Sequence, residues 1–250
     1  MILEIQSLSR NFGGLKAVDD VSLAVVDRTI QSVIGPNGAG KTTLFNLITG
    51  AVAPVAGTIR FQGEDVTGAA PERLARKGLV RSFQRTSIFR NLSVAENVQL
   101  AIRSRRGVNG AVRLTRPERL DIEDEAQAML TKVGLSGRER VTAGTLAHGS
   151  QRTLDIAIAL ALQPKLILMD EPMAGMSKGD RHRMADLIVK LRDEFGLTIL
   201  LVEHDIGVVM QLSDVVTVMQ TGRVIAEGPP QAIKENEDVK RAYLHGSFAA

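Results

Sequence analysis

The stretch that decides the fold reads Gly35-Pro36-Asn37-Gly38-Ala39-Gly40-Lys41-Thr42-Thr43. It fits the pattern G-x-x-x-x-G-K-[ST], which forms a phosphate-binding loop when it lies between a buried strand and a helix. Residues 29–34 are a short apolar run that predicts this strand, and a helix is expected to begin near Lys41. Because glycines let the loop curl, its backbone N–H groups can point at phosphate oxygens, and the helix dipole adds positive charge there. This context favours a phosphate-binding loop over an ordinary glycine-rich turn with a solvated lysine.

Three side chains of this loop have expected roles. Lys41 neutralises charge on the β- and γ-phosphates of a nucleotide. The hydroxyl of Thr42 is placed to bind Mg²⁺, and Thr43 is placed to contact phosphate. The sequence therefore predicts a nucleotide site with a magnesium ion.

A second signal is Leu166-Ile167-Leu168-Met169-Asp170-Glu171, an apolar strand that ends in two carboxylates. Ligands bind at the carboxyl ends of strands in open α/β sheets. Asp170 suits a carboxylate that holds Mg²⁺ directly or through an intervening ligand. Glu171 faces the other way and suits the base that orients an attacking water. The alternative is an Asp-Glu helix N-cap before Pro172, which the phosphate-binding loop makes less attractive.

Short apolar strands alternate with helices along the chain. Besides residues 29–34, we expect strands at residues 2–8, 21–26, 57–61, 166–169, 198–202, 215–219 and 224–226. Helices are expected at residues 71–77 and 178–195, and residues 92–162 carry apolar side chains at helical spacing. This order predicts an α/β fold, with a mainly parallel sheet covered on both faces and an all-helical lobe inserted between two portions of it.

The composition excludes several classes of function. The 250 residues are 44% apolar and contain no cysteine, which removes thiol catalysis, Cys-ligated zinc, iron–sulfur clusters and disulfides. A net charge of +3 and 3% aromatic residues do not mark a dedicated nucleic-acid binder. The N-terminal residues lack the pattern of a secretory signal, and the longest uncharged stretch, residues 42–59, is too polar to span a bilayer. Any membrane association is therefore expected to go through a partner or the surface.

Taken together, the motifs resemble the nucleotide-binding subunits of ABC transporters over nearly the whole chain. Phe12 fits the aromatic residue that stacks on adenine, Gln84 the glutamine that precedes the helical lobe, and His204 the switch histidine. Each is weak alone, but they occur in the family's order. The resemblance implies a P-loop NTPase core (residues 1–87 and 164–250) with a mainly parallel sheet and an antiparallel β subdomain, and an inserted all-helical subdomain (residues 88–163).

The family's signature loop, nominally L-S-G-G-Q, is matched imperfectly by Leu146-Ala147-His148-Gly149-Ser150. In the family this loop meets the γ-phosphate of ATP held by a second subunit. Gly149 and the start of a helix are retained, whereas Ala147, His148 and Ser150 replace the usual Ser, Gly and Gln. Ser177 also stands where many members carry an aspartate. Weaker closure and slow hydrolysis are therefore one alternative.

The resemblance further implies Mg-ATP hydrolysis in a head-to-tail homodimer or heterodimer bound to polytopic permease subunits, with a solute-binding protein indirectly involved. Glu171, His204 and Lys41 would be catalytic. ATP would contact Phe12, the loop from Gly35 to Thr43, Gln84 and the signature residues, with Thr42, Gln84 and Asp170 near Mg²⁺. The subunit would be peripheral, on the cytoplasmic face of the membrane. No nucleic acid is expected as a partner.

Details at residues 11–18, 171–176, 226–228 and 242–244 are most similar to the ATP-binding subunits of branched-chain amino acid importers. Export systems, soluble non-transport ABC ATPases and a non-hydrolysing regulator are the alternatives. An arginine-rich stretch, Arg103 to Arg119, is followed by Asp121, Glu123, Asp124 and Glu125. It is interpreted as a solvated insert rather than as a surface for anionic lipid or permease loops.

Overall fold

A computed structural model describes residues 1–82, 88–108 and 114–243. Gln84 and Arg113 lie outside these residues. The central sheet has the order β10-β9-β3-β8-β7-β6. Its strands are β3 (Ile30–Ile34), β6 (Leu79–Ser82), β7 (Leu166–Asp170), β8 (Thr198–Val202), β9 (Val215–Gln220) and β10 (Arg223–Gly228). All pairings are parallel except that of β10 with β9, which confirms the mainly parallel sheet.

A second sheet is antiparallel and has the order β2-β1-β4-β5. It contains β1 (Leu3–Phe12), β2 (Leu15–Val25), β4 (Ala56–Phe61) and β5 (Glu64–Asp65). β1 and β2 are longer than the alternation at residues 2–8 and 21–26 predicts. The reason is a set of register shifts between Ile5 and Asn11, which break the period of two while pairing continues to Phe12.

Helices cover both faces of the central sheet, as the alternation of strands and helices predicts. Along β7, Leu166 and Leu168 pack into a core with Leu44 and Phe45 of α1 (Lys41–Ile48). Ile167 and Met169 point to the opposite face and pack into a core with residues of α5 (His148–Ala161) and α6 (Lys178–Asp193). Because successive side chains of a strand point to opposite faces, an unbroken apolar strand serves both cores.

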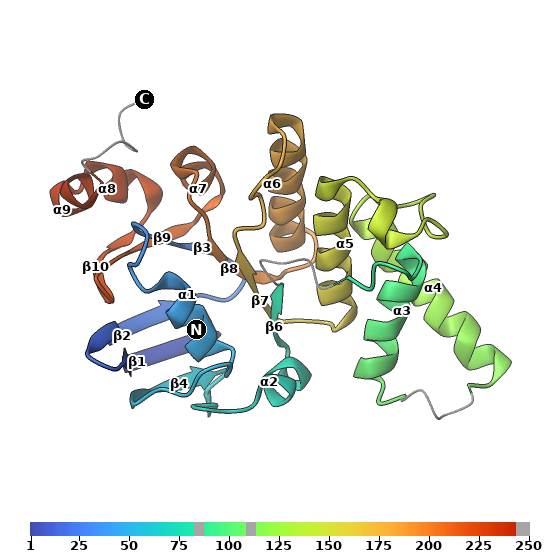
Figure 1. Cartoon of the computed structure of the whole chain (residues 1–250), viewed down its shortest axis with the longest axis horizontal. Coiled ribbons are helices and arrows are strands. Elements are labelled where there is room, and N and C mark those ends of the chain that lie inside the picture. The colour runs from blue at the N-terminus through green and yellow to red at the C-terminus, as the bar shows by residue number, and fades with distance from the viewer. Residues whose placement is uncertain (83–87, 109–113, 244–250) are drawn as a thin grey trace.

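Other helices flank this framework. They are α2 (Pro71–Lys77), which has the predicted bounds, and α7 (Ile206–Leu212), α8 (Pro230–Glu235) and α9 (Glu237–Ala242), which the sequence patterns did not predict. Figure 1 shows α8 and α9 beside β9 and β10, at the end of the molecule opposite to α3 and α4. In the part of the chain that the structure describes, no helix combines the length and the apolar character needed to cross a membrane.

The predicted helical lobe consists of α3 (Val94–Arg105), α4 (Arg116–Lys132) and α5, with a short 3₁₀ turn, η1 (Ala143–Thr145). These helices lie together at one end of the molecule (Figure 1). α3 and α4 each begin with a capping box, Ser93 with Glu96 and Thr115 with Glu118. The division of the chain at residues 88 and 163 stays a prediction.

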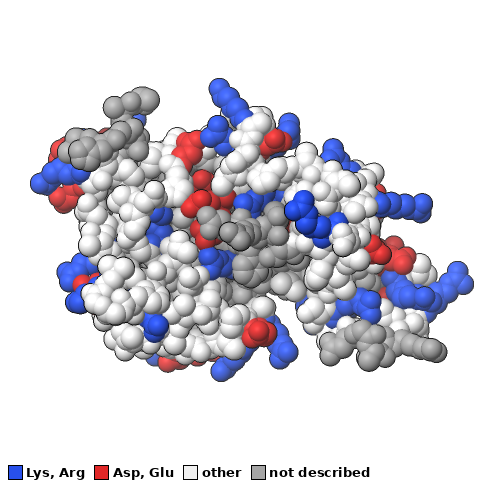
Figure 2. All heavy atoms as spheres, in the orientation of Figure 1, with Lys and Arg blue, Asp and Glu red and all other residues white. Residues whose placement is uncertain are grey.

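Acidic side chains of α4 pair with arginines at the end of α3. Arg106 contacts Asp121 and Glu125, and Arg105 contacts Glu125 at 2.8 Å. On the face shown in Figure 2, Lys and Arg side chains are spread over the surface with acidic groups among them. These ion pairs agree with the interpretation of the arginine-rich stretch as a charge-balanced surface.

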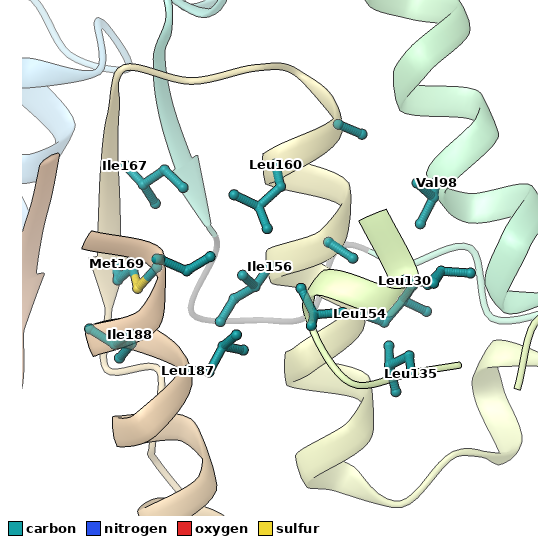
Figure 3. Close-up of a cluster of buried hydrophobic side chains, with 14 of the residues drawn as sticks. Val98, Leu130, Leu135, Leu154, Ile156, Leu160, Ile167, Met169, Leu187 and Ile188 are labelled. Atoms are coloured by element: carbon teal, nitrogen blue, oxygen red, sulfur yellow. The ribbon is translucent and has the colours of Figure 1, made fainter. Parts of the chain in front are cut away.

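The packing of the helical lobe depends on Leu154, which is fully buried on α5. Figure 3 shows it near Leu130 and Leu135. We expect Leu154→Ala to lower the free energy of unfolding by about 2–5 kcal/mol, because it removes buried methyl groups and leaves a cavity. Urea denaturation measures this loss. Leu120→Ala on α4 is the matched control, since Leu120 is 50% exposed, and an equal loss in both variants would contradict the packing described.

Candidate functional site

The candidate site lies where three neighbouring parallel strands end. β3 runs into the glycine-rich loop, β7 into Asp170-Glu171, and β8 into Glu203-His204. Asp170 is paired in register with Val202, so the residues that follow these two strands emerge side by side. A cavity of about 320 Å³ lies at this edge of the sheet. Its lining includes Phe12, the loop from Asn37 to Thr43, Glu171 and His204.

The glycine-rich loop approaches other backbone segments too closely for a side chain at Gly40. Gly40 has φ +102°, and a Cβ there would lie 2.3 Å from the carbonyl oxygen of Ala17. Glycine alone meets both requirements. The Nζ atom of Lys41 donates hydrogen bonds to the carbonyl oxygens of Gly35 at 2.7 Å and Pro36 at 3.0 Å. The loop is thus curled around the lysine, as the sequence motif predicts.

Lys41 and Thr42 begin α1, so the predicted start of this helix is confirmed. Lys41 is buried, and burial lowers the pKa of its ammonium group while Glu171 and Asp170 oppose that effect. The Thr42 side chain is exposed, and Thr42 and Thr43 both line the cavity. The loop therefore presents a cation, hydroxyl groups and the N-terminus of a helix to the same space, which is an arrangement suited to phosphate.

Glu171 and His204 meet at the edge of the cavity. The Nε2 atom of His204 lies 2.7 Å from Oε1 of Glu171. Glu171 has φ +50°, a left-handed conformation that is costly outside glycine, and its carboxyl meets His204 whereas that of Asp170 meets Arg81. The alternative of an Asp-Glu helix N-cap is wrong, because the next helix, α6, begins at Lys178 and is capped by Ser177.

Asp170 makes a buried ion pair that the sequence patterns did not reveal. Its Oδ2 atom accepts a hydrogen bond from Arg81 of β6 at 2.6 Å, and Arg81 also donates to Asn46 of α1 at 2.6 Å. The Asp170 side chain is 1% exposed and that of Arg81 12% exposed. Arginine thus compensates the carboxylate charge inside the fold.

The donor set fits a magnesium ion. Mg²⁺ prefers oxygen ligands and is commonly held by one or two protein oxygens together with the phosphates of a substrate. The exposed Thr42 hydroxyl lines the cavity and can supply such an oxygen directly. The Asp170 carboxyl is buried against Arg81 and does not line the cavity, so it can act on the metal only through an intervening ligand. Gln84, also expected near the metal, lies outside the described residues.

Glu203 is a further functional candidate that sequence reasoning missed. Its carboxyl is buried and accepts hydrogen bonds from the backbone N–H groups of Met173 at 2.9 Å and His204 at 3.1 Å. Burial raises the pKa of Glu203, and the two N–H groups oppose this rise. The available sequence signal was an acid directly before the switch histidine, at the end of an apolar strand.

Phe12 lies at the far side of the cavity, at the end of β1, and its side chain is 47% exposed. The guanidinium of Arg10 lies over its ring, 5.0 Å from the centroid. An exposed aromatic ring backed by a cation offers its other face for stacking. This placement suits the predicted contact with adenine.

The signature residues Ala147, His148, Gly149 and Ser150 do not line this cavity. Ala147 is the N-cap of α5, and Gly149 and Ser150 line a separate cavity of about 420 Å³. A Cβ on Gly149 would lie 3.0 Å from the carboxyl of Asp180, so glycine allows a close approach to α6. One chain therefore brings together the loop, Glu171, His204 and Phe12, but not the signature loop.

The family model described as ABC transporter matches residues 18–174, and that described as branched-chain amino acid ATP-binding cassette transporter matches residues 223–244. The high-affinity branched-chain amino acid transport ATP-binding protein BraF of Pseudomonas aeruginosa is 41% identical, over 97% of this chain and 97% of that protein.

The lipopolysaccharide export system ATP-binding protein LptB of Haemophilus influenzae is 33% identical over 99% of this chain and 98% of that protein. The crystal structure of an ATP-binding cassette of an ABC transporter in its ADP conformation has a TM-score of 0.86 and 31% identity, and the match covers 98% of this chain and 99% of that one. The likeness therefore extends over both sheets and the helical lobe.

The buried pair of Arg81 and Asp170 gives a prediction. Arg81→Met is expected to lower the free energy of unfolding by about 3–5 kcal/mol, because it leaves the Asp170 carboxylate buried without its partner. Lys190→Met is the control, since Lys190 and Glu194 are 3.8 Å apart and largely exposed; we expect it to cost less than about 0.5 kcal/mol. Urea denaturation compares the two, and equal losses would contradict a compensating role for Arg81.

Proposed function

The chain belongs to the ABC transporter family, and from this premise we propose that it binds and hydrolyses ATP to drive import by a membrane transporter. The observation that carries the proposal is the convergence of Lys41, Glu171 and His204 on one cavity at the ends of β3, β7 and β8. A phosphate-binding loop, a carboxylate and an imidazole are the groups that phosphoryl transfer to water requires.

Binding of ATP is assigned to the cavity lined by Phe12 and the phosphate-binding loop. The backbone N–H groups of the loop and the Lys41 ammonium hold the phosphates, while adenine stacks on the exposed face of Phe12. Thr43 contacts phosphate. The positive charge of Lys41 attracts the nucleotide. The close approach of Gly40 to the carbonyl oxygen of Ala17 holds the loop in the shape described above.

Hydrolysis is assigned to Glu171 and His204. Glu171 orients a water and accepts its proton, and its contact with His204 restrains the direction of its carboxyl. His204 donates a hydrogen bond to the γ-phosphate, and Lys41 stabilises the charge that develops during transfer. Thr42, with Asp170 acting through an intervening ligand and with Gln84, would hold Mg²⁺, and the ion would supply additional positive charge near the phosphates.

A second copy completes the site. Since Ala147 to Ser150 lie outside the cavity of their own chain, their role in contacting ATP requires another chain whose cavity faces them. A head-to-tail pair satisfies both chains at once and buries two nucleotides. ATP then favours the closed pair because it contacts both chains only when they are closed, and this differential affinity drives the attached permease.

The transported compounds proposed are branched-chain amino acids or similar small polar molecules, delivered to the permease by a solute-binding protein. Relatives named for branched-chain amino acid transport reach 41% identity, whereas the one named for lipopolysaccharide export has 33%. The match at residues 223–244 to a branched-chain family model supports the same choice. The subunit would sit on the cytoplasmic face of the membrane, held there by the permease.

Glu171→Gln tests the assigned chemistry. We expect this variant to lower kcat for ATP hydrolysis by about 10²–10⁴-fold, because the amide cannot accept the proton of water. ATP affinity should stay the same, since the loop and Phe12 are untouched. Phosphate release with Mg-ATP measures the first quantity, and equilibrium binding of ATP measures the second.

Glu194→Gln on the exposed end of α6 is the control and should hydrolyse ATP like the wild type. Cells that carry the chain with its permease should take up labelled leucine, and Glu171→Gln should stop this uptake. Unchanged phosphate release in Glu171→Gln would refute the assignment of the base, and uptake that persists would refute the coupling.

A further inference from the structure

Glu203 joins the two loops that carry the proposed catalytic groups. Its carboxyl accepts a hydrogen bond from the Met173 N–H at 2.9 Å, in the loop after β7, and one from the His204 N–H at 3.1 Å, in the loop after β8. Glu203 is 5% exposed. No step of the proposed hydrolysis uses this side chain.

These contacts close a ring of bonds. Met173 follows Glu171 by two residues, and His204 is the neighbour of Glu203 in the chain. The side chains of Glu171 and His204 meet at 2.7 Å, and the Glu171 N–H donates to the carbonyl oxygen of Val202 at 2.9 Å. The loops are thus tied at their backbones by Glu203 and at their tips by the Glu171–His204 contact.

The alternative is that Glu203 serves only the stability of the fold. Burying a carboxylate destabilises the fold relative to burying an apolar residue, because its charge must be taken out of water. Burial indeed raises the pKa of Glu203, and Glu171 opposes its ionisation further while His204 favours it. The two hydrogen bonds that Glu203 accepts from separate loops are a geometric role that an apolar residue could not fill.

We propose that Glu203 is a positioning residue for ATP hydrolysis, which fixes the separation of the Glu171 carboxyl and the His204 imidazole by holding the N–H groups of Met173 and His204. The inference rests on the proposed function. An apolar residue cannot accept these bonds, aspartate is one methylene too short to reach both, and glutamine has one carbonyl oxygen for two donors.

The test compares Glu203→Gln and Glu203→Asp with Thr198→Val. Thr198 is the matched control: it is buried at the opposite end of β8, and its hydroxyl accepts a bond from the Arg28 N–H at 2.9 Å and donates to Asp27 at 3.0 Å. It lies outside the proposed site. All three variants lose buried hydrogen bonds, but only the Glu203 variants free the catalytic loops.

Both Glu203 variants are expected to lower kcat about 10-fold or more, because small displacements of catalytic groups are costly. ATP affinity should change less than about twofold, since the phosphate-binding loop is untouched. Amide hydrogen exchange at Met173 and His204 should become faster in both. Thr198→Val should keep the wild-type kcat and the slow exchange at these two positions, even where its urea midpoint falls as far.

Other results would contradict either the positioning role of Glu203 or the proposed function. A kcat that falls equally in Thr198→Val and the Glu203 variants would reduce Glu203 to a structural role, and unchanged exchange at Met173 and His204 would refute the tie between the loops. A wild-type protein that binds ATP without releasing phosphate would refute the proposed function instead. In that case, exchange still decides whether Glu203 holds the loops.

Discussion

The parallel pairing of β3, β8 and β7 is the constraint on which the site depends. Val33 pairs with Val202, and Asp170 also pairs with Val202 across the other edge of β8. With this register, the glycine-rich loop, Glu203-His204 and Asp170-Glu171 leave the sheet at one edge although they are far apart in the chain. A slip of one residue would exchange the faces of a strand, sending Leu166 and Leu168 into the core now filled by Ile167 and Met169. Packing on both faces of the sheet therefore fixes the register, and the register brings the site residues together.

This edge of the central sheet brings together buried charged groups. Among the described residues, a different kind of partner compensates the charge of each buried group. Arg81 neutralises Asp170, backbone N–H groups bind Glu203, and carbonyl oxygens of the loop receive Lys41. Such compensation leaves Glu171 and His204, which are partly exposed, facing the cavity. The buried groups thus provide a fixed polar frame, and the groups assigned to hydrolysis act at its surface, where a nucleotide and a water can reach them.

The parts of this arrangement that are local in the chain could be predicted from the sequence. The start of α1 at Lys41 and the bounds of α2 and β8 follow from short patterns. The partners of the buried charges could not be predicted, because they are distant in sequence: Arg81 and Asp170 are separated by 89 positions. β6 is four residues long and contains this arginine, so it has no clear apolar pattern. α7 to α9 are also too short for a helical period to be recognised. The division into subdomains and the roles of Gln84 and the signature loop stay predictions.

We propose that one ATP site needs the phosphate-binding loop of one chain and the signature loop of another. Mixing two variants of the chain tests this shared site. Lys41→Ala removes the cation of the loop, and Gly149→Asp adds a carboxylate where the signature loop would approach phosphate. Neither variant should release phosphate alone. Their mixture should do so, since a mixed pair contains one site with both parts intact. A mixture as inactive as its components, or full activity of Gly149→Asp alone, would contradict the shared site.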